Sequence, residues 1–270
     1  MPWPRGTEEV STMHHPWILL RGLTREAAHW GSFADAFRHA LPGARVVAQD
    51  LPGNGLLHRA VSPATVRGMV DSCRAELAAQ GVRPPFRVLA MSLGAMVAVE
   101  WARVAPEELV GCVLINTSLR PFSPFYQRLR PASYLQVLRC AAPWSSPLTI
   151  EKTVLRMTSN LAHARGAVVG DWVALRRQRP VSASNALRQL LAAARYTAPV
   201  AAPLVPVSES PRILLLASQN DGLVSCRCSQ AIARAWGVPL QMHPLAGHDL
   251  PLDDAQWVIG QVRSWMEGSL

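Results

Sequence analysis

Three residues far apart in the sequence have the side chains that nucleophilic catalysis by a serine hydroxyl requires. Ser92 lies in the sequence AMSLG, Asp221 in SQNDG and His248 in LAGHD. A serine hydroxyl is a weak nucleophile near neutral pH, so it needs a base within about 3 Å. We expect His248 to take the proton of Ser92 and to pass it to the leaving group. Asp221 is then expected to orient the imidazole and to stabilise its cation.

The residues around Ser92 fit a tight turn between a strand and a helix. AMSLG is a form of the G-x-S-x-G motif with alanine in the first glycine position, and the flanking residues are small because the backbone is crowded there. Such a turn holds the serine in a strained conformation. We expect the backbone N–H groups of Leu93, at the helix start, and of Leu23, after the first strand, to bind the oxyanion. An ordinary helix cap at Ser92 is the alternative.

Apolar runs and segments of helical length alternate along the chain from Trp17 onward. The runs are continuous and rich in Val, Ile and Leu, which is typical of strands covered on both faces of a parallel sheet. The alternation predicts an α/β fold with a doubly wound, mostly parallel sheet. The expected strands are residues 17–20, 44–48, 86–91, 110–115 and 213–217, and the expected helices are residues 66–80, 93–104, 229–236 and 255–266.

Ser92 and Asp221 each come after an expected strand, and His248 comes after a further short apolar run. Because the C-terminal ends of parallel strands lie at one edge of a sheet, we expect the three residues to converge there. Asp221 in a plain Asn-Asp-Gly turn and His248 in a surface loop are the alternatives. Asp249 fits a charged loop, and Asp50 fits a turn that it orders through backbone hydrogen bonds. Other histidines suit the role less well. His14 and His15 precede the first expected strand, His29 and His39 lie in or near a helix, and His163 lies between positions 119 and 210, where a cap is expected.

The alternation stops between positions 119 and 210. This segment is rich in proline at both ends, has helical patterns at 150–161 and 186–194, and contains eleven arginines. A long segment without strands is suited to cover a pocket. We therefore expect an α/β core formed by residues 1–118 and 211–270, with residues 119–210 as an inserted helical cap.

The positive charge of the chain comes almost entirely from arginine. The formal net charge is +9, and Lys152 is the single lysine. A GC-rich genome explains such a composition, and attraction to an acidic partner is the functional alternative. We expect no nucleic-acid binding, because the sequence has no zinc-finger spacing, RNA-recognition motif or basic helix pattern.

Cysteine usage and hydropathy indicate the compartment. Five cysteines, with Cys112 inside an apolar run, argue against a disulfide scaffold and favour a reducing environment. Cys226 and Cys228 lack the spacing of a zinc knuckle, so we expect no metal. The chain has no stretch of about 18 apolar residues and no apolar signal-peptide core near its first residues. We expect a cytoplasmic protein without a membrane span.

At these motifs the chain resembles the α/β-hydrolases over nearly its whole length, from Trp17 to Met266. The sequence DLPGNG, which begins at Asp50, is similar to the family's D-x-P-G-x-G loop. The serine, aspartate and histidine occur in the order of the family's catalytic triad. The resemblance implies a serine hydrolase that acts on a small-molecule substrate without a cofactor.

Within this family the chain is similar to the pimeloyl-acyl-carrier-protein methyl ester esterases of biotin synthesis and to similar small carboxylesterases. The shared features are the DLPG loop, the SLG elbow and a helical cap that carries arginines. The resemblance implies hydrolysis of a carboxylic ester through an acyl-enzyme, with the acyl chain under the cap. It also implies that cap arginines such as Arg139, Arg156 and Arg176 grip an acidic acyl carrier protein.

The chain departs from the family after the first strand, where Arg21-Gly22 replaces the usual His-Gly. That histidine is structural, so we expect the oxyanion site to be kept, but a buried arginine needs a carboxylate partner. The triad also leaves thioester, lactone and C–C bond hydrolysis and acyl transfer open. Dehalogenase and epoxide hydrolase chemistry are disfavoured, because those enzymes use an aspartate where Ser92 stands. A non-catalytic ligand receptor is the alternative outside enzymes, and the sequence does not predict the oligomeric state.

Overall fold

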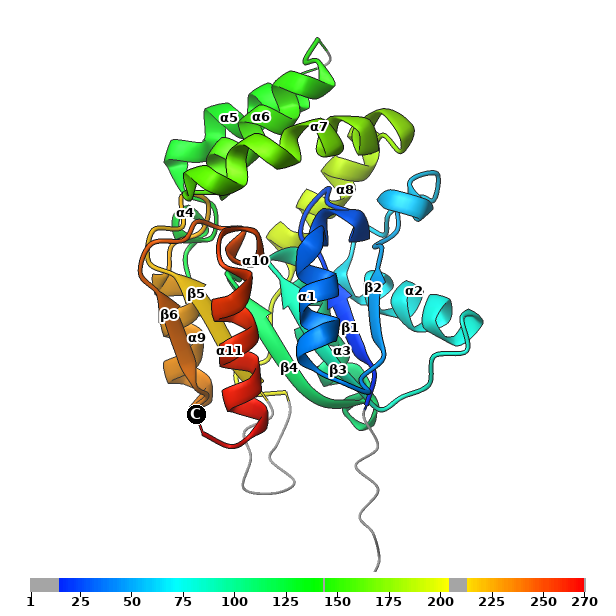
Figure 1. The fold of residues 1–270 in the computed structure, drawn as a ribbon, viewed down its shortest axis with the longest axis vertical. Helices are drawn as coiled ribbons and strands as arrows, with labels where there is room; N and C mark the ends of the chain where they lie inside the picture. Colours follow the sequence, from blue (N-terminus) through cyan, green and yellow to red (C-terminus); the bar gives the residue numbers. More distant parts are fainter. Residues whose placement is uncertain (1–14, 143, 204–212, 270) are drawn as a thin grey trace, which may run out of the picture.

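The computed structural model describes residues 15–142, 144–203 and 213–269. Within these residues the chain forms one sheet of six strands in the order β2-β1-β3-β4-β5-β6, and every neighbouring pair is parallel (Figure 1). The predicted α/β class with a doubly wound parallel sheet is confirmed. The strands are β1 (Trp17–Leu20), β2 (Val46–Gln49), β3 (Phe86–Met91), β4 (Leu109–Ile115), β5 (Ile213–Ser218) and β6 (Leu240–His243).

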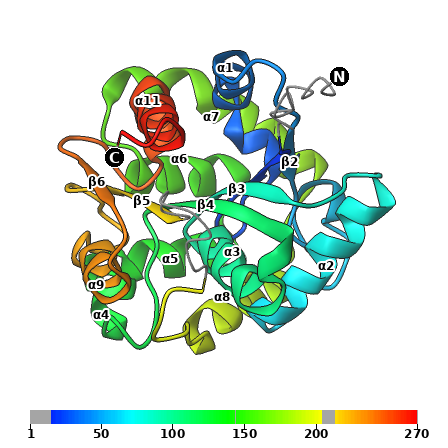
Figure 2. The ribbon, with the colours of Figure 1, turned by 90° about the horizontal axis from the view of Figure 1, so that it is seen from below.

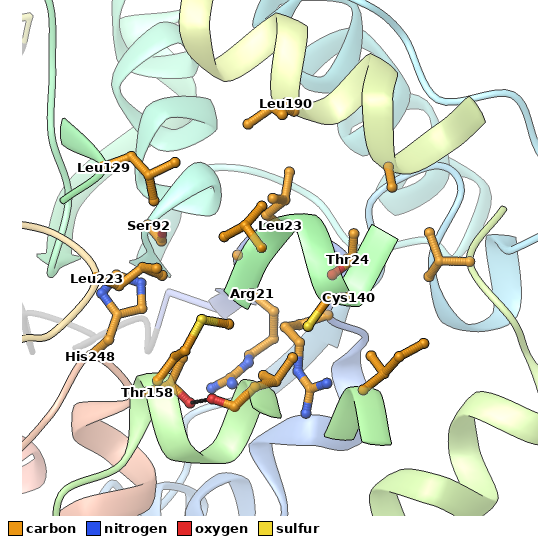
Figure 3. A pocket seen from close by; sticks show the side chains of 18 of the residues that line it. Arg21, Leu23, Thr24, Ser92, Leu129, Cys140, Thr158, Leu190, Leu223 and His248 are labelled. Atoms are coloured by element: carbon orange, nitrogen blue, oxygen red, sulfur yellow. Dashed lines mark hydrogen bonds between the residues drawn. The ribbon is translucent and has the colours of Figure 1, made fainter. Parts of the chain in front are cut away.

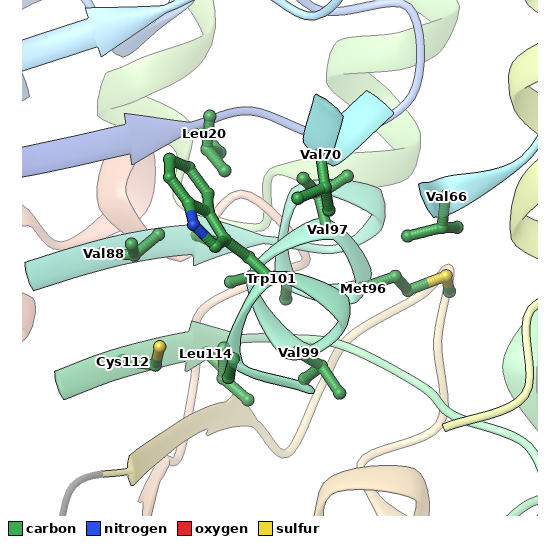
Figure 4. Packing of buried hydrophobic residues seen from close by; sticks show 14 of the residues in the cluster. Leu20, Val66, Val70, Val88, Met96, Val97, Val99, Trp101, Cys112 and Leu114 are labelled. Carbon is green, nitrogen blue, oxygen red and sulfur yellow. The ribbon is translucent and has the colours of Figure 1, made fainter. Parts of the chain in front are cut away.

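Helices cover both faces of the sheet, which explains why its strands are apolar on both sides (Figure 2). Successive residues of a strand point to opposite faces, so Leu19 and Leu20 belong to different cores. Trp101 is fully buried and lies in one core with Leu20 and Val88 (Figure 4). One face is covered by α2 (Val66–Ala79), α3 (Leu93–Val104) and α9 (Arg227–Trp236), and the other by α1 (Ser32–Ala40) and α11 (Ala255–Met266).

The described part of the segment between β4 and β5 is helical. Figure 1 shows α5, α6 and α7 above the C-terminal ends of the strands. The helical patterns at 150–161 and 186–194 correspond to α6 and α8. The sequence did not predict α7, because its apolar residues do not recur on one face. The role of this segment as a cap stays a prediction. Its helices are α4 (Phe125–Arg128), α5 (Tyr134–Ala141), α6 (Pro147–Thr158), α7 (Ala162–Gln178) and α8 (Ala183–Arg195).

Several elements begin and end at the expected residues, among them β1, β3, α3 and α11. In the described ranges, no helix has both the length and the hydrophobicity that a membrane crossing requires. Short helical turns connect the larger elements: η1 (Ala27–Trp30), η2 (Gly55–Leu57), η3 (Pro106–Glu108), η4 (Pro131–Ser133) and α10 (Leu250–Asp253).

The start of α3 approaches the end of β1 at the level of the backbone. A Cβ atom at Gly94 would lie 2.6 Å from the carbonyl oxygens of both Leu20 and Arg21, far inside van der Waals distance. Both neighbours are backbone atoms of the central sheet or of the loop after it, so they cannot move aside as a flexible side chain would. A glycine at position 94 is therefore what lets the helix begin directly at the sheet edge.

We expect Gly94→Ala to lower the free energy of unfolding by about 1–3 kcal/mol, the usual cost of overpacking a close contact. Urea denaturation monitored by tryptophan fluorescence measures the change. Gly260→Ala is the matched control, because Gly260 lies in α11 and its added Cβ would meet no atom within 4 Å. That variant should be about 0.5–1 kcal/mol more stable than the parent. Equal unfolding midpoints for Gly94→Ala and the parent would contradict the close approach.

Candidate active site

The candidate residues follow strands at one edge of the sheet. Ser92 follows β3, Asp221 lies in the loop after β5, and His248 lies in the loop after β6. The strand order reverses between the neighbours β1 and β3, and open α/β sheets bind ligands at such a reversal. Ser92 and His248 line one cavity of about 490 Å³, which the loop after β1 lines as well (Figure 3).

Ser92 has an unusual backbone conformation, with φ 54° and ψ −115°. This positive φ is rare for a residue with a side chain and costs about 1–3 kcal/mol. Two hydrogen bonds hold the residue there: its N–H donates to the Ile115 carbonyl at 3.0 Å, and its carbonyl accepts from the Thr117 hydroxyl at 3.1 Å. A Cβ atom at Gly22 would lie 3.1 Å from the Ser92 Cβ, so the facing loop also needs a small residue.

The His248 ring is bound to the Asp221 carboxylate. Nδ1 of His248 lies 2.7 Å from Oδ2 of Asp221, and only 3% of the histidine and 1% of the aspartate are exposed. The second oxygen, Oδ1, accepts from the backbone N–H groups of Leu223 at 2.7 Å and Val224 at 2.9 Å. Because an ionised carboxylate can only accept, the proton of the neutral ring lies on Nδ1, and Nε2 is left as an acceptor.

The backbone donors expected at the oxyanion site are Leu23 and Leu93. Leu93 is the first residue of α3, where N–H groups have no partner within the helix. Among the hydrogen bonds of the described residues, none is donated by the N–H of Leu23 or of Leu93. Leu23 lines the cavity together with Ser92 (Figure 3).

Asn116 is a residue of the candidate site that the sequence alone did not predict. It follows β4 with φ 46°, and its side chain joins two loops of the site. Its Nδ2 donates to the His248 carbonyl at 2.8 Å, and its Oδ1 accepts from the Ser218 N–H at 2.8 Å. Asn116 therefore fixes the loop of His248 relative to the end of β5, from which the loop of Asp221 departs. Its place directly after an expected strand was the one signal in the sequence.

Arg21 is paired with Asp249, so the expectation that this arginine needs a carboxylate partner is confirmed. The guanidinium donates to both carboxylate oxygens, at 3.0 and 2.5 Å, and 3% or less of either residue is exposed. Burial acts to raise the pKa of Asp249, but the charge and hydrogen bonds of Arg21 outweigh burial and lower this pKa below its usual value. Asp249 is thus a buried ion rather than a residue of a charged surface loop.

The three cap arginines differ in their surroundings. Arg139 on α5 and Arg156 on α6 are exposed. Arg176 on α7 is half-buried, lines the cavity and donates from Nε to Glu151 at 2.5 Å.

Asp50 lies outside the cavity lining and orders its own turn as expected, by accepting from the Leu56 N–H at 2.8 Å. In the part of the chain that the structure describes, no group of three His, Cys, Asp or Glu side chains is placed to hold a metal.

Comparisons with known proteins agree with this architecture. A model of the alpha/beta hydrolase family matches residues 17–261. A malate-bound thermophilic esterase from Thermogutta terrifontis has a TM-score of 0.70 at 22% identity, covering 94% of this chain and 90% of that one. The esterase RhEst1 from Rhodococcus sp. ECU1013 has a TM-score of 0.71 at 16% identity, covering 95% of this chain and 91% of that one. A hydrolase from Pseudomonas aeruginosa PA01 has a TM-score of 0.69 at 21% identity, covering 94% of this chain and 91% of that one. These identities show the fold alone. A search of curated proteins found no match.

We expect Asp249→Asn to lower the free energy of unfolding by about 3–5 kcal/mol at pH 7, because it leaves the buried Arg21 cation without a counter-charge. Asp35→Asn is the matched control. It breaks the exposed pair with Arg38 on α1 and should change stability by about 0.5 kcal/mol or less. Urea denaturation measures both, and equal effects of the two substitutions would contradict the buried ion pair.

The pH dependence of stability gives a second test of the same pair. The pKa of Asp249 is lower in the folded protein than in the unfolded chain. Its contribution is therefore fully present above the unfolded pKa, about 3.9, and is lost as the pH falls through the folded value. Below about pH 4, the stability of Asp249→Asn should fall less steeply with pH than that of the parent. If the stabilities of the parent and of Asp249→Asn fall equally steeply with pH in this range, the lowered pKa of Asp249 is contradicted.

Proposed function

The chain belongs to the alpha/beta hydrolase family, and from this premise we propose that it is a serine hydrolase that cleaves carboxylic esters. Ser92 is the nucleophile, His248 the general base and Asp221 the carboxylate that orients the base. The observation that carries the proposal is the buried bond between His248 Nδ1 and Asp221, together with Ser92 in the lining of the same cavity as His248. This arrangement leaves Nε2 as the ring atom that can take a proton.

The reaction follows from these positions. Ser92 Oγ attacks the ester carbonyl while Nε2 of His248 accepts the hydroxyl proton. The tetrahedral intermediate collapses, the bond to the alcohol oxygen breaks, and His248 returns the proton to the leaving alcohol. Water, deprotonated by the same ring, then attacks the acyl-enzyme and releases the acid and the free serine. Asp221 stays ionised throughout and stabilises the imidazolium.

The unused N–H groups of Leu23 and Leu93 support an oxyanion hole at this serine. They belong to the loop after β1 and to the start of α3, the two segments that meet beside Ser92. Removal of one such donor costs other enzymes about 100-fold to 1000-fold in kcat. Fixed backbone donors need no reorganisation as the negative charge develops, which is why we assign them this role.

We also propose that the inserted segment, of which the structure describes residues 119–142 and 144–203, acts as a helical cap over the substrate. Val154 of α6 and Leu187 and Leu190 of α8 contribute to the cavity wall, while Ser92 and His248 come from the sheet edge. An acyl chain inside this cavity is therefore in contact with both parts of the chain. Such a cover excludes water from the acyl-enzyme and strengthens the electrostatic interactions of the site.

Ser92→Ala tests the proposed nucleophile directly. Hydrolysis of a short-chain p-nitrophenyl ester should fall by about 10⁴ to 10⁶ in kcat, because the triad acts as a unit. Ser72→Ala is the control, since Ser72 lies on α2, outside the cavity lining, and bonds only its own helix. Equal turnover by Ser92→Ala and the parent would contradict the proposal.

Exposed arginines support a finer proposal, that the ester is carried on an acidic acyl carrier protein. Arg139 and Arg156 are exposed on α5 and α6, and these same helices line the cavity with Val137 and Val154. A carrier bound to the outer side of these helices would therefore be close to the cavity. Arg176 is not part of this surface, because its guanidinium is bonded to Glu151 at the cavity.

The double reversal Arg139→Glu/Arg156→Glu should raise KM for a carrier-bound ester by about tenfold through lost electrostatic steering. KM for a small neutral ester should stay unchanged. Arg234→Glu, an exposed site on α9, makes a charge change away from the proposed surface and should affect neither substrate. If the double reversal changes both substrates alike, the positive cap is a feature of composition and not a docking surface.

A further inference from the structure

One wall of the cavity contains charged side chains that the proposed reaction does not use. Glu151 is fully buried on α6 and accepts from two arginines, Arg25 Nη1 at 2.7 Å and Arg176 Nε at 2.5 Å. Both arginines line the cavity. Cys140 lines the cavity as well, and burial raises the pKa of its thiol.

The charged groups occupy one side of a mostly apolar cavity. Figure 3 shows Arg21 and Cys140 on the side away from Leu190. Apolar side chains supply most of the rest of the lining, among them Leu23, Leu129, Val154, Leu187, Leu190 and Leu223.

The charges on this wall do not balance. Three guanidinium groups, those of Arg21, Arg25 and Arg176, face two carboxylates, those of Asp249 and Glu151. The sum of +3 and −2 leaves one positive charge. The neighbouring His29 does not add to it, because burial and then the nearby arginines lower its pKa far below the usual value and keep the ring neutral.

Arg25 shares its counter-charge, because its carboxylate partner Glu151 also binds Arg176. Arg25 is 7% exposed and its guanidinium stacks on the Trp172 ring at 4.0 Å. Its Nη2 is buried and has no acceptor among the described residues. Burial lowers the pKa of Arg25 to about 10, although the charge of Glu151 opposes this change. A buried cation with an unused donor is unfavourable unless an anion is supplied.

We propose that this wall binds a carboxylate on the substrate, so that the preferred ester is the monoester of a short dicarboxylic acid. The proposal rests on the ester hydrolysis proposed above and is an alternative to the carrier-bound ester, because an acyl chain attached to a carrier at its far end has no free carboxylate there. The ester group lies at Ser92, the free carboxylate at Arg176 and Arg25, and the methylene groups contact the apolar lining. One net positive charge matches a carboxylate, and guanidinium groups bind carboxylates with charge-assisted hydrogen bonds.

Two esters that differ only at the far end of the acyl chain test this subsite. Mono-p-nitrophenyl glutarate has a carboxylate where p-nitrophenyl pentanoate has a methyl group. The readout is the ratio of kcat/KM for the glutarate ester to that for the pentanoate ester. The parent ratio should exceed 1, and Arg176→Gln should lower it by about tenfold, the size of a lost charge-assisted hydrogen bond. A parent ratio of 1 or less, or an unchanged ratio in Arg176→Gln, would overturn the proposal.

Two further variants distinguish the loss of a charge at the subsite from a general loss of folding. Glu151→Gln removes a competing carboxylate and should raise the ratio, which is opposite to the effect of Arg176→Gln. Arg177→Gln is the matched control, because Arg177 is the next residue on α7 and is exposed. Its ratio should equal that of the parent. If Glu151→Gln lowers the ratio, or if Arg177→Gln shifts it as much as Arg176→Gln does, the subsite is refuted.

A binding measurement keeps this test separate from that of the reaction. Calorimetric titration of Ser92→Ala with glutarate reports the subsite without hydrolysis. Binding that weakens about tenfold on adding Arg176→Gln supports the subsite, even if no ester is cleaved and the proposed function fails. Absence of binding, or equal binding by both proteins, refutes the subsite and leaves Ser92-dependent hydrolysis of neutral esters untouched.

Discussion

The site depends on one strained turn, at which β3 ends, Ser92 adopts a positive φ and α3 begins. A serine keeps this conformation only where its surroundings hold it, and here β1 and β4 do so from both sides. The contact with β4 is made by hydrogen bonds, and the contact with the end of β1 requires that Gly22 and Gly94 have no side chains. The central strands thus determine where the hydroxyl lies, and the other groups are arranged around it.

Two neighbouring residues in the loop after β6 hold it from different directions. His248 binds Asp221, which comes from the end of β5, and Asp249 binds Arg21, which comes from the end of β1. Asn116, at the end of β4, bonds the backbone of the same loop. The loop that carries His248 is therefore connected to three strand ends, and the ring has little freedom to leave the carboxylate. Positioning of this kind is what general base catalysis requires of a scaffold.

The sequence predicted those features of the structure that depend on local patterns of residues. Continuous apolar runs predicted the parallel strands, and the small residues around Ser92 predicted a turn between β3 and α3, which the structure has. Partners more than a hundred positions apart, such as Asp249 for Arg21 and Glu151 for Arg25, have no signature in residue type or spacing, because the fold alone brings them together. The helix α7 was not predicted because it also lacks a local signature: its apolar residues form no single stripe along the helix. The catalytic roles of the three candidate residues stay predictions.

Labelling with a fluorophosphonate tests most directly whether the strained turn makes Ser92 a nucleophile. Such a reagent modifies serines that a neighbouring base activates, and intact mass with peptide mapping locates the adduct. We expect one adduct, on Ser92, which forms in the parent and forms far more slowly in His248→Ala. An adduct on another residue, or labelling of Ser92 at the same rate without the imidazole, would contradict it.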